Sequence, residues 1–134
     1  MPYLLDSDVI IDFLKQKDPG YSLVKKICRE ELFISVITWI EIAYGIKKAH
    51  LAPKRLNQFR AFLKDSNIGL IPIDQNIGLE FVDLKISLED KGAKLADFDL
   101  LITAVAKVYK LTLVTRNLKH FERTGLKIFK NIES

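Results

Sequence analysis

Short apolar runs alternate along the chain with longer segments in which apolar residues recur every three or four positions. The short runs are typical of buried strands, and we expect strands at Tyr3–Leu5, Leu32–Ile34, Leu70–Ile73, Leu111–Val114 and Leu126–Phe129. The longer segments predict helices at about Val9–Gln16, Tyr21–Glu30 and Ser35–Ala49, from Pro53 onwards, from about Asp74 to Asp90, and at Phe98–Tyr109. Strands separated by helices indicate an α/β fold with a central parallel sheet of four to five strands and helices on both faces.

Length and composition set limits on this fold. The chain has 134 residues, of which 49% are hydrophobic and 28% charged, and no linker divides it, so we expect one domain, residues 1–134. Cys28 is the one cysteine, which excludes an internal disulfide and a cysteine-based metal site. No apolar run approaches the roughly 20 residues that a membrane helix needs, and the start lacks the pattern of a signal peptide. We therefore expect a cytoplasmic protein. The net charge of +4 is compatible with a polyanionic ligand.

Acidic residues stand where apolar segments end or helices begin. Asp6 directly follows the first strand, and Glu41, Asp97 and Asp99 lie near the starts of two later helices. Helix capping explains each acid singly: Asp6 to Asp8 could cap the first helix, Thr38 and Glu41 fit a capping box, and Asp97 could be an N-cap. Capping by Asp8 leaves Asp6 unexplained, because Asp6 directly follows a buried apolar strand and acids are rarely buried without a partner.

Parallel strands offer a second interpretation of these acids. The carboxyl ends of such strands lie at one edge of the sheet, where ligands usually bind, so the side chains would converge there. Phosphoryl-transfer sites with two metal ions need several carboxylates from separate elements. Oxygen ligands without Cys or His suit Mg²⁺, with Mn²⁺ as the other possibility.

Four segments, in order, give a resemblance over nearly the whole chain: Tyr3–Asp12, Ser35–Gly45, Leu95–Ala104 and Leu111–Phe121. They resemble those of PIN-domain nucleases and, within that family, of the VapC-type toxins of toxin–antitoxin pairs. The resemblance implies that Asp6, Glu41 and Asp99 are the principal metal-binding and catalytic acids, with Asp97 as a further acid. The family's fourth acidic position usually holds Asp, whereas this chain has Asn117. A neutral amide there puts the second metal ion in doubt.

The segment after the fourth strand also carries candidate substrate contacts. Thr115 resembles the family's hydroxyl residue at the end of that strand, and Arg116, Lys119 and His120 follow in a basic stretch. Any of these could contact an RNA phosphate, although a surface histidine on a loop explains His120 equally well. For Asp8 we favour a capping role and for Asp12 a structural one, on the solvent side of the first helix. Phe121 is predicted to be a core residue.

The resemblance implies a Mg²⁺-dependent endoribonuclease, acting through metal-activated water on RNA of the translation machinery. It also implies a VapB-like antitoxin as partner and a homodimer. Two alternatives remain open. A haloacid-dehalogenase-type phosphatase would use Asp6 as its nucleophile, since Asp6-Ser7-Asp8-Val9 imitates that family's motif. A non-catalytic PIN-like domain that binds RNA or protein would explain Asn117.

Overall fold

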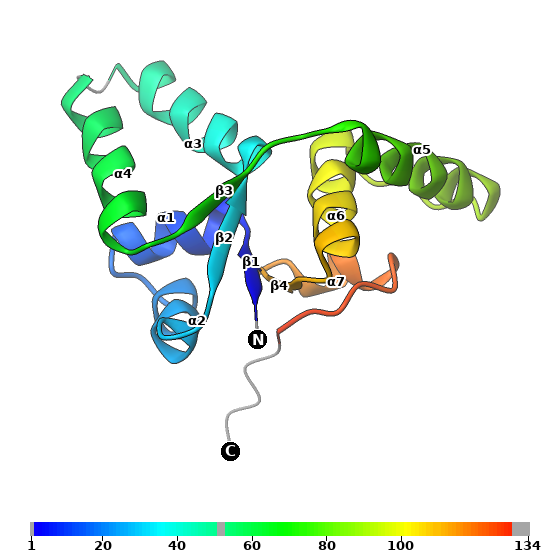
Figure 1. Ribbon diagram of the computed structural model, residues 1–134, viewed down its shortest axis with the longest axis horizontal. Helices are drawn as coiled ribbons and strands as arrows, with labels where there is room; N and C mark the ends of the chain where they lie inside the picture. The colour runs from blue at the N-terminus through cyan, green and yellow to red at the C-terminus, as the bar shows by residue number, and fades with distance from the viewer. Residues whose placement is uncertain (1, 51–52, 130–134) are drawn as a thin grey trace.

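A four-stranded parallel sheet forms the centre of the protein. The computed structural model describes residues 2–50 and 53–129. The strands are β1 (Tyr3–Leu5), β2 (Leu32–Ser35), β3 (Gly69–Ile71) and β4 (Thr112–Val114). Their order is β3-β2-β1-β4, and every neighbouring pair is parallel (Figure 1). The predicted α/β class is confirmed, and β3, which precedes Pro72, lies at an edge of the sheet. All four carboxyl ends therefore lie at the same edge of the sheet.

The expected fifth strand at Leu126–Phe129 is reduced to a single parallel bridge between Leu113 and Ile128. Two backbone hydrogen bonds accompany it, from Leu113 N to Lys127 O at 2.9 Å and from Phe129 N to Leu113 O at 2.8 Å. The apolar pattern at Leu126–Phe129 correctly predicted parallel pairing, but the pairing with β4 is a single bridge and is too short to form a fifth strand.

Seven helices surround the sheet in the described part of the chain. They are α1 (Ser7–Leu14), α2 (Gly20–Ile27), α3 (Val36–Lys48), α4 (Pro53–Asp65), α5 (Gln75–Asp90), α6 (Asp97–Tyr109) and α7 (Leu118–Glu122). The first six confirm the predicted helices to within three residues at each predicted end; for α4 only the start, at Pro53, was predicted. Helix α7 was not predicted. None of the described helices is long and apolar enough to cross a bilayer.

Helix caps fix where the helices start relative to the strands. Asp74 caps α5, accepting a hydrogen bond from Ile77 N at 3.0 Å. The capping box expected at Thr38 and Glu41 is wrong, because α3 is capped by Ser35, whose Oγ accepts from Thr38 N at 3.2 Å. Ser35 ends β2, so α3 starts directly at the sheet edge. Glu41 then lies in the second turn of α3 and plays no part in the cap.

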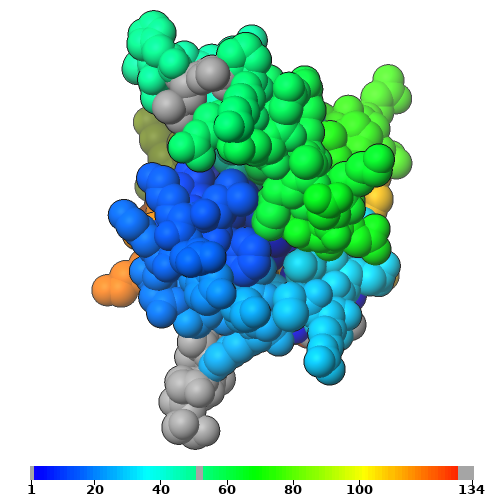
Figure 2. Space-filling view, turned by 90° about the vertical axis from the view of Figure 1, so that its left-hand side faces the viewer, coloured from blue at the N-terminus to red at the C-terminus, as the bar shows by residue number. Residues whose placement is uncertain are grey.

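Side chains of the strands alternate between two apolar cores, as the period of two in a strand requires. On β1, Tyr3 and Leu5 face the core that α1, α2 and α4 cover, and Leu4 faces the core that α5 and α6 cover. The two groups of helices lie on opposite faces of the sheet in Figure 1. Figure 2 views the molecule from the first side, where α1, α2 and α4 form most of the surface. Both faces being buried, the strand-end residues at the edge are the ones left to bind a ligand.

Candidate functional site

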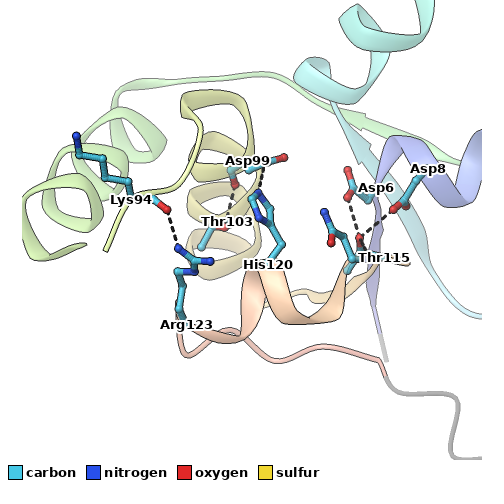
Figure 3. A network of polar contacts seen from close by, with 9 residues as sticks. Asp6, Asp8, Lys94, Asp99, Thr103, Thr115, His120 and Arg123 are labelled. Carbon is cyan, nitrogen blue, oxygen red and sulfur yellow. Dashed lines mark hydrogen bonds and ion pairs between the residues drawn. The ribbon is translucent and has the colours of Figure 1, made fainter. Parts of the chain in front are cut away.

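Asp6 and Thr115 form the centre of the site at the carboxyl edge. Each directly follows a strand, and Leu5 of β1 is paired with Val114 of β4, which brings the two side chains together. Thr115 Oγ1 donates to Asp6 Oδ2 at 2.9 Å, and the other oxygen, Oδ1, accepts from Ser7 N at 2.9 Å (Figure 3). Asp6 is thus both the strand-end acid and the N-cap of α1, with 6% of its surface exposed.

Asp8 lies beside this pair instead of capping the helix. Its Oδ2 accepts from the backbone N–H of Arg116 at 3.1 Å and lies 3.3 Å from Thr115 Oγ1 (Figure 3). Its other oxygen, Oδ1, is buried and has no hydrogen-bond partner. The capping role expected for Asp8 belongs to Asp6, two residues earlier, because the chain turns into the helix directly after β1.

Glu41 and Asp99 approach the same edge from α3 and α6. Glu41 Oε1 is buried without a partner. Asp99 lies in the first turn of α6, as predicted, and its Oδ2 is 2.7 Å from His120 Nε2 on α7 (Figure 3). Burial raises the pKa of Glu41, and the charges of Asp99 and Asp8 raise it further, while the same two charges also raise the pKa of Asp6. The structure therefore places Asp6 and Glu41 each within electrostatic range of both Asp8 and Asp99.

Burial and mutual repulsion raise the pKa values of the central acids. Burial is the largest cause for Asp6, whose pKa rises from 3.8 to about 7, and the charge of Asp8 is the next. Burial likewise raises the pKa of Asp8 and of Glu41. A bound cation would oppose both effects, because it favours the ionised carboxylates.

The donor set fits a hard divalent cation. With the side chains in these positions, no group of three or more His, Cys, Asp or Glu among residues 2–50 and 53–129 is arranged to hold a metal ion. One reason is that the Asp99 carboxylate is hydrogen-bonded to His120. Two carboxylate oxygens, Asp8 Oδ1 and Glu41 Oε1, are nevertheless buried without a partner. Carboxylate oxygens of this kind are ligands for Mg²⁺ or Mn²⁺.

Asp97 and Asn117 lie at the border of the site. Asp97 is the first residue of α6, and its expected capping role is wrong, since Ala96 stands at the N-cap and no side chain caps the helix. The Asp97 side chain is 62% exposed and forms an ion pair with Lys85 of α5 at 3.1 Å. Asn117 is at the N-cap position of α7, and its backbone N–H donates to Thr115 Oγ1 at 3.1 Å.

The basic stretch after β4 is divided between structure and surface. Arg116 Nη1 pairs with Asp12 Oδ1 at 3.0 Å, and Asp12 Oδ2 accepts from Gly20 N at 3.0 Å. Asp12 is only 5% exposed, so the expectation that it faces solvent is wrong, whereas its structural role is confirmed. Lys119 is exposed on α7, and Phe121 is buried in the second core, as predicted.

Two features of the site escaped the sequence interpretation: the position of Asp8 and the pairing of Asp12 with Arg116. Asp8 and Asp12 are four residues apart on α1, so they share one helix face, and both contact Arg116, through its backbone and its side chain respectively. That spacing was the available signal. It marks the face of α1 that packs against the loop between β4 and α7.

Comparison with known proteins agrees with this architecture. A family model described as "PIN domain" matches residues 3–127. The chain is 32% identical to "Ribonuclease VapC1" of Methanocaldococcus jannaschii, over 94% of this chain and 85% of the relative, and 25% identical to "tRNA(fMet)-specific endonuclease VapC" of Shigella flexneri, over 93% of each. The crystal structure of VapBC2 from Rickettsia felis, bound to a DNA fragment from their promoter, superposes with a TM-score of 0.83 at 27% identity and covers 97% of this chain and 98% of that chain.

Proposed function

Because the chain belongs to the PIN-domain family and, within it, to the VapC group, we propose that it is a metal-dependent endoribonuclease and the toxin of a toxin–antitoxin pair. The observation that carries this proposal is the gathering of carboxylates from β1, α3 and α6 at one sheet edge, with buried oxygens that have no partner within the described chain. Acids with only a structural role would be paired or exposed.

Asp6, Glu41 and Asp99 are the proposed metal-binding and catalytic acids, with Asp97 and Asn117 at the border. Mg²⁺ is the proposed cofactor and Mn²⁺ a possible substitute. When bound, such an ion activates a water molecule for attack on phosphorus and stabilises the charge that develops on the phosphate oxygens. The chain's own residues hold the carboxylates in place. Thr115 keeps Asp6 oriented through its hydroxyl, and His120 keeps Asp99 oriented through Nε2.

RNA is the proposed substrate, and the name of the Shigella flexneri relative favours RNA of the translation machinery. Lys119 and His120 on α7 are the proposed contacts to phosphate, since cations on this rim would offset repulsion between the acids and a polyanion. We expect Arg116 and Thr115 to support the phosphate contacts from within the protein, because the Arg116 guanidinium is paired with Asp12 and the Thr115 side chain is buried. The proposed place of action is the cytoplasm.

A VapB-like antitoxin is the proposed partner, and a homodimer the proposed assembly. Large apolar side chains are exposed near the site on α1 and α3: Ile11, Leu14, Ile40 and Tyr44. A partner segment that covers this surface would bury apolar area, and a cation from it could pair with the carboxylates. Expression of the chain alone should arrest growth, and co-expression with the neighbouring small gene should restore it. Harmless overproduction of the parent protein would contradict the role as a toxin.

The nuclease itself is tested with purified protein and a structured RNA. The parent should cleave in Mg²⁺ and not in EDTA, and Asp99→Asn should lower the rate at least about 100-fold. Asp97→Asn should lower it less, because the Asp97 side chain is mostly exposed and directed to Lys85. Asp83→Asn, an exposed acid on α5, is the matched control and should cleave like the parent.

The same experiment separates the alternatives. RNA binding without cleavage in Mg²⁺ or Mn²⁺ would favour a non-catalytic binding domain. Hydrolysis of p-nitrophenyl phosphate in place of RNA would favour a phosphatase of the haloacid dehalogenase type.

A further inference from the structure

Asp8 lies inside the proposed site, and only half of its carboxylate has a structural role. Oδ2 anchors the loop after β4 by accepting from Arg116 N at 3.1 Å. Oδ1 is buried and has no partner in the described chain. An anchor for a backbone N–H needs one acceptor oxygen, which an uncharged side chain would supply at a smaller desolvation cost. The negative charge at this position therefore needs another explanation.

No cation among the described residues forms an ion pair with Asp8, and burial raises its pKa more than the hydrogen bonds from Arg116, Val9 and Thr115 and the charge of Arg116 lower it. The Thr115 hydroxyl has one proton, and its nearer acceptor is Asp6 Oδ2 at 2.9 Å, against 3.3 Å for Asp8 Oδ2. The guanidinium of Arg116 pairs with Asp12. Thr115 Oγ1 contacts both carboxylates, which places Asp8 directly beside the acid that follows β1.

Asp8 and Asn117 belong to one hydrogen-bonded unit. Thr115 Oγ1 accepts from Asn117 N at 3.1 Å while it contacts both Asp6 and Asp8. The side chain of Asn117 is neutral, and the carboxylate of Asp8 accepts from the backbone of the same three-residue loop through Arg116 N. The two residues are therefore anchored to the same loop of the proposed site.

We infer that Asp8 is a further carboxylate of the metal site and supplies the negative charge that Asn117 does not. This inference rests on the proposed function, since it concerns the same metal site. It assigns to Asp8 a contact with the cation through Oδ1, while Oδ2 continues to hold the loop. The chain would thus keep the charge of the site while changing the residue that carries it.

Charge exchange between the two positions provides the test. Mn²⁺ is titrated by calorimetry into the full-length parent and into Asp8→Asn, Asn117→Asp and the double variant. Asn at position 8 keeps the size of the side chain and an acceptor for Arg116 N, so this substitution removes only the charge. We expect Asp8→Asn to weaken Mn²⁺ binding about 10- to 100-fold, Asn117→Asp to strengthen it, and the double variant to return close to the parent. Asp83→Asn should leave binding unchanged.

The outcomes separate the metal-binding role of Asp8 from the proposed metal-dependent function on which it rests. Recovery of binding in the double variant supports the inference and shows that the loss in Asp8→Asn does not come from unfolding. Unchanged Mn²⁺ binding in Asp8→Asn, with loss of binding in Asp6→Asn, would overturn the inference and leave the proposed function standing. Failure of Asn117→Asp to restore binding would also overturn it. No Mn²⁺ binding by the parent would overturn the inference together with the proposed function.

Discussion

Asp6→Asn isolates the energetic cost of the charge at the centre of the site. Asn is as good an N-cap as Asp, so the hydrogen bond from Ser7 N to Oδ1 is kept, while the amide nitrogen that replaces Oδ2 can donate to Thr115 Oγ1, whose own proton can turn to Asp8 Oδ2. The substitution therefore changes the charge of a buried group and little else. Measured in EDTA, it reports on the protein without divalent cations.

The magnitude follows from the pKa of Asp6, which rises from 3.8 to about 7 on folding. Between these two values the folded chain holds a proton that the unfolded chain has released, so the parent loses stability as the pH rises. The slope is about 1.4 kcal/mol per pH unit, and the whole shift is worth about 4 kcal/mol. Asp6→Asn lacks this group, so its stability relative to the parent should increase from about pH 4 to about pH 7 and then level off.

Urea unfolding at several pH values between about 5 and 8 measures this difference. Asp8 and Glu41 titrate in both proteins, so their contribution largely cancels when the two curves are subtracted. Asp83→Asn, at an exposed position on α5, should differ from the parent by a constant. A difference between Asp6→Asn and the parent that does not vary with pH would refute the argument that burial and the charge of Asp8 hold Asp6 protonated.

Two further predictions concern the contacts that hold α1 in place. Gly20→Ala should destabilise the protein by about 1–3 kcal/mol, because a Cβ there would lie 2.4 Å from Asp12 Cβ. Gly45→Ala, where no atom lies within 4 Å of the added Cβ, should instead stabilise helix α3 by about 0.5–1 kcal/mol. Thermal melts in which the two variants shift the melting temperature in the same direction would contradict this. Arg116→Ala leaves the buried Asp12 without its cation and should lower the free energy of unfolding clearly more than Lys119→Ala, an exposed lysine expected to change it by less than about 0.5 kcal/mol. Equal effects in urea unfolding would mean that the Arg116 pair does not stabilise the fold.

The strands, the main helices and the strand-end acid were predictable because each depends on a local pattern. Tyr3, Leu4 and Leu5 are apolar throughout, as a strand buried on both faces requires, and Asp6 breaks that run. Its place at the carboxyl edge then follows from parallel pairing alone. Phe121 was assigned to the core on hydrophobicity, and it is almost fully buried.

The features that were predicted wrongly or missed depend on which of two neighbouring residues caps a helix, or on pairs of residues far apart in the sequence. Whether Asp6 or Asp8 caps α1, and whether Ser35 or Thr38 caps α3, is decided by where each strand ends, and neighbouring polar residues have similar capping preferences. Helix α7 has five residues, too few to show a helical period. The pair of Asp12 with Arg116 joins residues 104 positions apart, which no local pattern contains.

Partners within the chain divide the acids of the site into two groups. Three of the acids have a basic partner within the chain: Asp97 has Lys85, Asp12 has Arg116 and Asp99 has His120. The central acids Asp6, Asp8 and Glu41 have no such ion pair among residues 2–50 and 53–129, and they are the ones whose pKa is raised. Asp12 is as buried as Asp6 but has its cation within the chain, as expected of an acid that stabilises the fold, since unpaired buried charge is costly. The lack of such a pair at Asp6, Asp8 and Glu41 leaves the central negative charge to be neutralised from outside the chain, as a divalent cation, or a cation from a partner protein, would do.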